Sequence, residues 1–229
     1  TPAQPRVSIC VLPFSNMSGD LEQEYFSDGI TEDIITDLSK VSALAVVSRN
    51  TAFTFKGKNV DLPQVARQLK VNYVREGSVR RAGGRVRITA QLIEASSDNH
   101  LWAERYDRDL NDIFALQDEI SEAIVKALRL KLLPEEKKAI EQRGTTNLQA
   151  YNLYLMARQR YATGQMSDAR RSDTVIRLCR GAIELDPNYA RAWALMATAQ
   201  RHRMYATGQG DNGSVAAARA IELDANLAE

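Results

Sequence analysis

The pattern of hydrophobic and polar positions divides the chain into two parts. The first part contains both strand and helix patterns, and the second contains helix patterns alone. Residues 7–14 are apolar on both alternating faces, which is typical of a central strand covered on both sides. Ile30, Ile34 and Leu38 then recur at four-residue spacing, which predicts a helix. Asp20 and Gln23 stand three residues apart before it and can cap its start. A short strand at residues 44–48 and a short helix at residues 62–69 follow.

The clearest local signal is a β-hairpin. Its arms, residues 73–81 and 85–93, flank Gly83 and Gly84, which supply the positive φ that a tight turn requires. Apolar and polar residues alternate along the second arm, so it has one buried and one polar face. The residues of the buried face are Val86, Ile88, Ala90 and Leu92.

A fifth strand at residues 101–106 and an amphipathic helix at residues 113–132 complete the first part. The order β-α-β-α-β-β-β-α predicts a mixed five-stranded sheet with helices packed on it.

Beyond a polar stretch at residues 134–146, only helical patterns occur, and the chain repeats itself. The letters AIELD at residues 182–186 return at residues 220–224, 38 residues later. A period of this size indicates stacked helical hairpins, and the region resembles tetratricopeptide repeats. Trp193 takes the early aromatic position of that pattern and Ala197 the small position. About three repeats are normally needed to bury a common core, so we expect the array to be incomplete.

These patterns predict four segments: a linker at residues 1–5, an α/β domain at 6–133, a linker at 134–146 and repeats at 147–229. The 229 residues are 44% hydrophobic, which is enough for a core in each of the two domains.

Charge and cysteine content narrow the classes of function. Thirty basic and 29 acidic residues give a net charge of +1, so no global field attracts the chain to nucleic acid or anionic lipid. Cys10 and Cys179 lie in apolar patterns and are expected to be small buried hydrophobes, not a disulfide. We find neither a signal peptide nor an apolar run long enough to span a membrane.

Motifs for catalysis and for cofactors are weak. His100 and His202 are the only histidines, and both are expected to face solvent, so neither supports a catalytic triad. The GxGxxG match at residues 208–213 lies between repeat helices, where a loop is the better interpretation than a dinucleotide site. We therefore expect no catalytic residue, no cofactor and no metal.

Two charged segments could be binding sites, one for calcium and one for nucleic acid, but each also has a purely structural interpretation. Residues 107–118 carry aspartates at calcium-loop spacing, but Asp112 replaces the required glycine, so helix capping by Asn111 or Asp112 is favoured. Five arginines surround the hairpin, and a solvated face neutralised in part by Glu76 and Glu94 is favoured over nucleic-acid binding. These arginines are Arg75, Arg80, Arg81, Arg85 and Arg87.

The repeat surface is the leading candidate for binding, because the first helices of such hairpins line a groove and carry Tyr, Trp and Arg anchors. Our candidates for a protein or peptide partner are Tyr151, Tyr154, Arg158, Arg191 and Trp193. Tyr154 and Trp193 have an equal alternative as packing between helices. An enzyme or small-molecule pocket at the loops of residues 18–29 is the competing hypothesis.

Residues 11–40, beginning VLPFSNMSGDLEQEYFSDG, and residues 55–120, including RVRITAQLIEASSDNHLWAERYDRD, resemble the TolB amino-terminal-like domain. The resemblance covers residues 6–132. It implies a three-layer fold of the anticodon-binding type with strand order 2-1-3-4-5. In bacterial regulators this domain precedes tetratricopeptide repeats.

The resemblance also implies a role. Such domain pairs follow a class III adenylyl cyclase domain, or a winged-helix DNA-binding domain and a membrane helix. This chain is then a non-catalytic regulatory part with an output domain attached upstream. Its charge pattern, as argued above, predicts no nucleic-acid contact of its own. A membrane enters only through an upstream helix, so the compartment stays open between the cytoplasmic and the periplasmic side.

Overall fold

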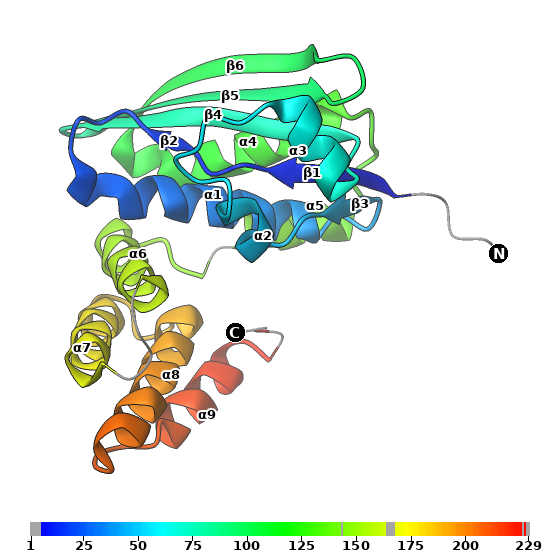
Figure 1. Cartoon of the computed structure of the whole chain (residues 1–229). Coiled ribbons are helices and arrows are strands. Elements are labelled where there is room, and N and C mark those ends of the chain that lie inside the picture. The colour runs from blue at the N-terminus through cyan, green and yellow to red at the C-terminus, as the bar shows by residue number, and fades with distance from the viewer. Residues whose placement is uncertain (1–5, 143, 164–167, 226, 228–229) are drawn as a thin grey trace. The chain divides into compact units, whose positions relative to one another are not determined.

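The computed structural model describes residues 6–142, 144–163, 168–225 and 227. It divides the chain into two compact units, Thr1–Gln142 and Arg143–Glu229. The first unit contains the strands and the helices that pack on them, and the elements described in the second unit are all helices (Figure 1). The linker expected at residues 1–5 lies outside the described residues.

The first unit is built on one mixed sheet in the order β3-β1-β4-β5-β6. This is the strand order 2-1-3-4-5 that the resemblance implied. A further two-residue strand, β2 (Ser15–Asn16), pairs with β4 off this path and makes the sheet six-stranded. The other strands are β1 (Val7–Val11), β3 (Leu44–Val46), β4 (Tyr73–Ala82), β5 (Arg85–Glu94) and β6 (Asn99–Asp109).

Strand direction changes at β4. β1 pairs in parallel with β3 and with β4, whereas β4–β5 and β5–β6 are antiparallel. The parallel pairs need helical crossovers, which α1 (Glu24–Ser39), α2 (Arg49–Phe53) and α3 (Leu62–Leu69) supply. The antiparallel pair β4–β5 needs only a tight turn, and Gly83 adopts a φ of 58° there.

Helices cover both sides of the sheet, as the fold class predicts. α1 and α4 (Ile113–Ala127) pack on each other and on the sheet, and the predicted apolar residues of β5 are buried beneath them. α3 contacts β4 and lies in front of the sheet in Figure 1, with α4 behind it. β1 is buried at Ile9, Cys10 and Val11, as expected of a strand covered on both sides, and burial raises the pKa of Cys10 to about 12.

β6 is longer than predicted, because its pairing with β5 continues beyond residues 101–106 at both ends. Asn99 and His100 pair with Glu94 and Ile93, and Asp109 pairs with Arg85. His100 was expected in a turn, and it is instead an exposed residue of this strand.

Arg75 corrects our interpretation of the hairpin arginines, because it is completely buried. Its guanidinium lies 3.2 Å from the centroid of the Phe14 ring, and its Nη1 donates to the carbonyl oxygen of Leu12 at 3.1 Å. Nε and Nη2 have no hydrogen-bond partner in the described part of the chain. Burial holds the pKa of Arg75 well below its usual value. Arg80, Arg85 and Arg87 are exposed, as expected.

Next to Arg75, Gly77 allows a close approach between β4 and β5. A Cβ atom at residue 77 would lie 2.0 Å from the backbone oxygen of Thr89 and 3.0 Å from the Phe14 ring. Only glycine fits between these two groups.

Most of the expected linker at residues 134–146 is helical, which corrects the domain boundary. α5 (Pro134–Glu141) belongs to the first unit, and its Ile140 is fully buried. The Glu136 carboxylate accepts from the backbone N–H of Ser42 at 2.8 Å and of Leu133 at 2.9 Å. The sequence pattern did not predict this helix because its buried residues, Glu136 and Ile140, include only one apolar side chain.

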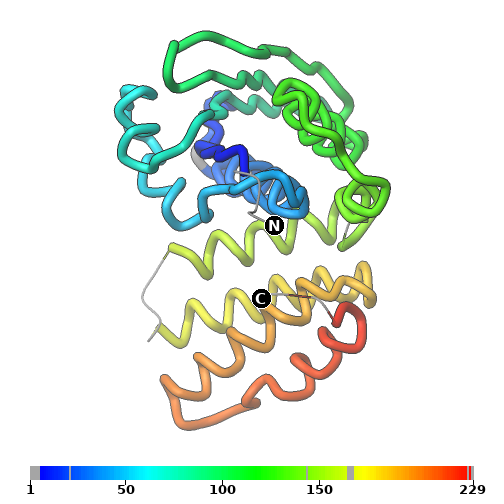
Figure 2. The backbone as a smooth tube through the Cα atoms, turned by 90° about the vertical axis from the view of Figure 1, so that its right-hand side faces the viewer, coloured from blue at the N-terminus to red at the C-terminus, as the bar shows by residue number. Residues whose placement is uncertain are grey.

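The second unit is a series of helices in which each packs on the next (Figure 2). They are α6 (Leu148–Ala162), α7 (Ala169–Leu185), α8 (Ala190–Thr207) and α9 (Ser214–Leu223). Small residues, among them Ala157 and Ala182, are fully buried between them. The assignment to tetratricopeptide repeats stays a prediction. No described helix is both long and apolar enough to cross a membrane.

We predict that Gly77→Ala lowers the free energy of unfolding by about 3 kcal/mol, because the new methyl group meets a backbone oxygen that cannot move alone. Gly84→Ala is the matched control, since a Cβ atom there meets nothing within 4 Å. We expect it to change stability by less than about 0.5 kcal/mol. Urea unfolding followed by circular dichroism measures both, and equal stabilities would refute the close approach.

Glu136 makes stability depend on pH. The backbone N–H of Leu133, and then the side chain and backbone N–H of Ser42, hold the pKa of Glu136 below its usual value. A carboxylate with a lowered folded-state pKa stabilises the fold above its unfolded pKa, and this contribution is lost as pH falls through the folded pKa. We predict that Glu136→Gln lowers the Tm by a few degrees at neutral pH and that the difference disappears in acid.

Thermal melts across this pH range test the prediction, with Glu135→Gln as the control. Glu135 is its exposed neighbour in the same helix. A Tm difference for Glu136→Gln that is the same at every pH would show that the carboxylate is not the group responsible.

Candidate partner-binding surface

The two tyrosines among the five candidate residues are part of the core of the second unit. Tyr151 and Tyr154 on α6 are buried, with exposed fractions of 3% and 1%. The ring of Tyr154 packs against that of Tyr189, with 5.0 Å between the centroids. A buried tyrosine cannot anchor a partner, so the structure favours the packing alternative for Tyr154 and corrects the assignment of Tyr151.

Trp193 also has a structural role. Its indole Nε1 donates to the carbonyl oxygen of Pro187 at 2.9 Å and so fixes the turn between α7 and α8. Its side chain is half-buried. Arg158 on α6 and Arg191 on α8 are half-buried too, and their binding of a partner stays a prediction.

A cluster that the sequence analysis missed joins α6, α7 and α8. Tyr161 stacks on His202, with 5.6 Å between the ring centroids, and the guanidinium of Arg171 lies 5.2 Å from the centre of the Tyr161 ring. Arg171 donates to the backbone oxygens of Arg160 and Tyr161 at the end of α6. His202 is therefore packed and not simply facing solvent as expected, and burial, with Arg201 and Arg171, lowers its pKa.

Comparing the two copies of the sequence repeat reveals an exposed surface on α9. Ile183 and Ile221 occupy the same position in the two copies of AIELD, yet 9% of Ile183 is exposed against 64% of Ile221. α8 packs on α7, whereas α9 packs on α8 through Ala216 and Ala220 and leaves Ile221 uncovered. Val215 is 73% exposed on the same helix. Two large exposed aliphatic side chains on one short helix can bind an apolar partner.

Several polar groups of residues 18–29, our competing site, bond within the protein, but Gln23 Oε1, Ser27 Oγ and Asp28 Oδ1 are buried without a hydrogen-bond partner among the described residues. Ser18 Oγ accepts from the backbone N–H of Arg81 at 2.9 Å, and Asp20 Oδ1 accepts from that of Glu22 at 2.8 Å. Gln23 Nε2 donates to the other carboxylate oxygen of Asp20 at 3.3 Å. The two bonds of Asp20 lie within the turn of η1 (Leu21–Gln23), which leads into α1. The N-cap residue of α1 itself is Gln23, which makes no capping bond with its side chain, so Asp20 does not cap α1 as expected.

The aspartates at calcium-loop spacing have a capping role, but not through the residues we favoured. Asp109 Oδ1 accepts from the backbone N–H of Asn111 at 2.9 Å and caps η2 (Leu110–Asp112). Asp112 precedes α4 but makes no capping bond with its side chain. Among the described residues, no group of three or more His, Cys, Asp or Glu is placed to hold a metal ion.

The GxGxxG segment forms the turn between α8 and α9. Gly208 and Gly213 adopt positive φ values of 69° and 82° at the two helix ends. A Cβ atom at residue 213 would lie 2.2 Å from the backbone oxygen of Ala197. The segment is therefore a turn, as the loop interpretation predicted, and Gly213 allows a close approach to the backbone of α8.

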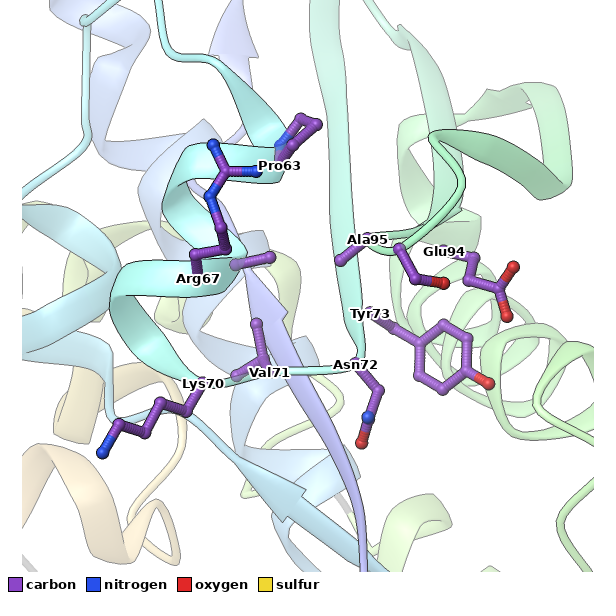
Figure 3. Close-up of a pocket in the computed structure, with 10 residues that line it drawn as sticks. Pro63, Arg67, Lys70, Val71, Asn72, Tyr73, Glu94 and Ala95 are labelled. Atoms are coloured by element: carbon purple, nitrogen blue, oxygen red, sulfur yellow. The ribbon is translucent and has the colours of Figure 1, made fainter.

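The first unit has a cavity of about 350 Å³ between α3 and the start of β4 (Figure 3). Its polar side chains do not converge, since Lys70 and Glu94 point to opposite sides. Asn72 is engaged elsewhere, because its Oδ1 accepts from Ser8 Oγ at 2.7 Å. A second cavity, of about 650 Å³, lies between β6, α4 and α5.

Comparison with known proteins identifies the family. Residues 5–123, just over half of the chain, match the HilA/YgeH-like transcriptional regulator, second domain. The chain belongs to this family. The matched residues lie within the α/β unit described above, which is also where the TolB-type resemblance lies.

A curated relative is similar over most of the chain. "Putative adenylate cyclase 3" of Rhizobium meliloti (strain 1021) is 53% identical over 193 residues, which cover 84% of this chain and 32% of that protein. The chain thus spans about a third of the length of this relative.

Solved structures resemble part of the chain. TolB from Acinetobacter baumannii has a TM-score of 0.41 and 18% identity, covering 55% of this chain and 29% of its own. Lipoprotein GNA1162 from Neisseria meningitidis has a TM-score of 0.40 and 20% identity, covering 56% of this chain and 99% of its own.

The two repeat-equivalent isoleucines give a matched prediction. Ile183→Ala removes buried methyl groups and is expected to lower the free energy of unfolding by about 2–4 kcal/mol. Ile221→Ala is expected to change it by less than about 0.5 kcal/mol, because that side chain is exposed in this chain. Urea unfolding followed by the helical circular dichroism signal compares the two. Equal losses would show that α9 is covered as α7 is.

Proposed function

We propose that this chain is a non-catalytic regulatory and protein-interaction module of a bacterial signalling protein, and that the parent protein is a class III adenylyl cyclase. The observation that carries the proposal is the relative named an adenylate cyclase, which is 53% identical over most of this chain. Since the match spans only 32% of that protein, two thirds of its length remain to hold a cyclase domain.

The helical unit supplies the interaction surface in this proposal. A tetratricopeptide array presents its first helices to a protein or peptide, and here these are α6 and α8, which bear Arg158 and Arg191. The exposed face of α9 offers apolar contacts for a further helix. The α/β unit, which is of TolB amino-terminal type in this interpretation, provides the rigid base that connects this surface to the output domain.

A chimaera of the Rhizobium meliloti relative tests the proposal. The segment aligned with this chain is replaced by the chain itself, either unchanged or with Arg158→Glu and Arg191→Glu, and cyclic AMP formation from ATP is measured in cells. We expect the unchanged chimaera to keep a regulated rate. The double reversal is expected to change the rate severalfold by preventing partner capture, and thermal melts check that the variant is folded.

The control carries Arg177→Glu and Arg180→Glu, which reverse two exposed charges on α7. We expect this control to behave as the unchanged chimaera. If both double variants give the rate of the unchanged chimaera, the proposed groove has no regulatory role.

A second candidate function is favoured by the family itself. The matching model describes the second domain of a transcriptional regulator, so the output domain can be a winged-helix DNA-binding domain in place of a cyclase. In that case the same module would control promoter binding. The two candidates are separated by the parent protein's activity: cyclic AMP formation supports the cyclase, and sequence-specific DNA binding without it supports the regulator.

A further inference from the structure

The sheet of the first unit ends in a long edge strand. β6 has 11 residues, whereas β3 at the opposite edge has three. Within the described part of the chain β6 pairs with β5 on one side, and no strand pairs with its outer side. An edge of this length offers a row of backbone donors and acceptors to another strand.

Helix α4 does not close this edge. The second cavity lies directly beside β6, and both Glu104 and Tyr106 line it together with residues of α4 and α5. Ala103, Glu104 and Arg105 in the middle of the strand are exposed. A second strand can therefore approach the outer side of β6 without displacing a helix.

Geometry restricts how a second copy can pair with this strand. Two identical edges pair antiparallel about a two-fold axis perpendicular to the sheet, so each face of one sheet continues into the same face of the other. Because side chains alternate between the faces, such a register must be centred on one residue that lies opposite itself. Each possible register is thus named by its central residue.

Like charges on β6 disfavour several of these registers. Centring on Glu104, Arg105, Asp107 or Arg108 places that charge directly opposite its own copy, which is destabilising. Centring on Tyr106 instead places Glu104 opposite Arg108 and Arg105 opposite Asp107, each twice by symmetry. Registers centred on Trp102 or Ala103 bring no acidic residue opposite an arginine.

We propose that the outer edge of β6 is a homodimer interface in which two copies pair antiparallel about Tyr106. Within one copy, Asp107 already lies between two arginines, whereas Arg108 pairs with Glu119 and would exchange this partner for Glu104 of the second copy. Asp107 Oδ1 lies 2.6 Å from Arg87 Nε and its Oδ2 lies 3.3 Å from Arg105 Nε, so the strand holds a carboxylate oriented among arginines. In the dimer, Arg105 of the second copy extends this ladder of opposite charges across the interface. The occupant of the edge is therefore a second copy of this chain.

The experiment uses the whole chain in sedimentation velocity over a range of concentrations, for the wild type and three variants. We expect the wild type to form a dimer that dissociates in the micromolar range, because one strand pair buries less area than a standard interface. Arg105→Asp and Asp107→Arg, each alone, create like-charge pairs and are expected to weaken dimerisation about tenfold. Arg80→Asp, on β4 and exposed, is the control and is expected to leave it unchanged.

Mixing the two edge variants separates the proposed register from a loss of folding. In a heterodimer of Arg105→Asp with Asp107→Arg, every pair at these positions has opposite charges again, so affinity near that of the wild type is expected. Circular dichroism melts check that each variant is folded. A wild type that is monomeric at all concentrations, or a mixture that dimerises no better than the separate variants, overturns the proposal.

Discussion

The first unit depends on the pairing of β4 on both of its sides. β1 pairs with it in parallel and β5 antiparallel, so this strand joins the part of the sheet built by crossovers to the part built by hairpins. Gly77 lets the Thr89 backbone and the Phe14 ring approach β4, and Arg75 lies against the same ring. Because β4 and β5 are paired over ten residues, β6 continues the sheet and becomes its long outer edge.

Much of this unit could be predicted from the sequence, because the signals are local. The turn at Gly83 and the alternation along β5 depend on neighbouring residues, and the structure confirms both. Burial of Arg75 could not be predicted, since it depends on Phe14, which is 61 residues away in the sequence and reaches it only through the fold. Helix α5 was not predicted for a similar reason, because Glu136 holds it in place by accepting a hydrogen bond from the backbone N–H of the distant Ser42.

The candidate surface was predicted less well than the fold. A repeat pattern identifies which positions face a neighbouring helix, but it does not distinguish a core aromatic from a binding aromatic. Tyr151 and Tyr154 proved to be core residues, whereas the contrast between Ile183 and Ile221 was contained in the sequence repeat and became visible only with burial. His202 stacks on Tyr161, 41 positions earlier, and no local sequence pattern predicts this contact. The function therefore rests on the relatives, and the geometry supplies the surfaces through which it can act.

The central claim is that this chain regulates and does not catalyse. Its most direct test is to incubate the purified chain with ATP and Mg²⁺ or Mn²⁺ and to measure cyclic AMP by mass spectrometry, with the full-length Rhizobium meliloti relative beside it. The account predicts that cyclic AMP forms with the relative and stays at the background level with the chain. Cyclic AMP formation by the chain alone would contradict it.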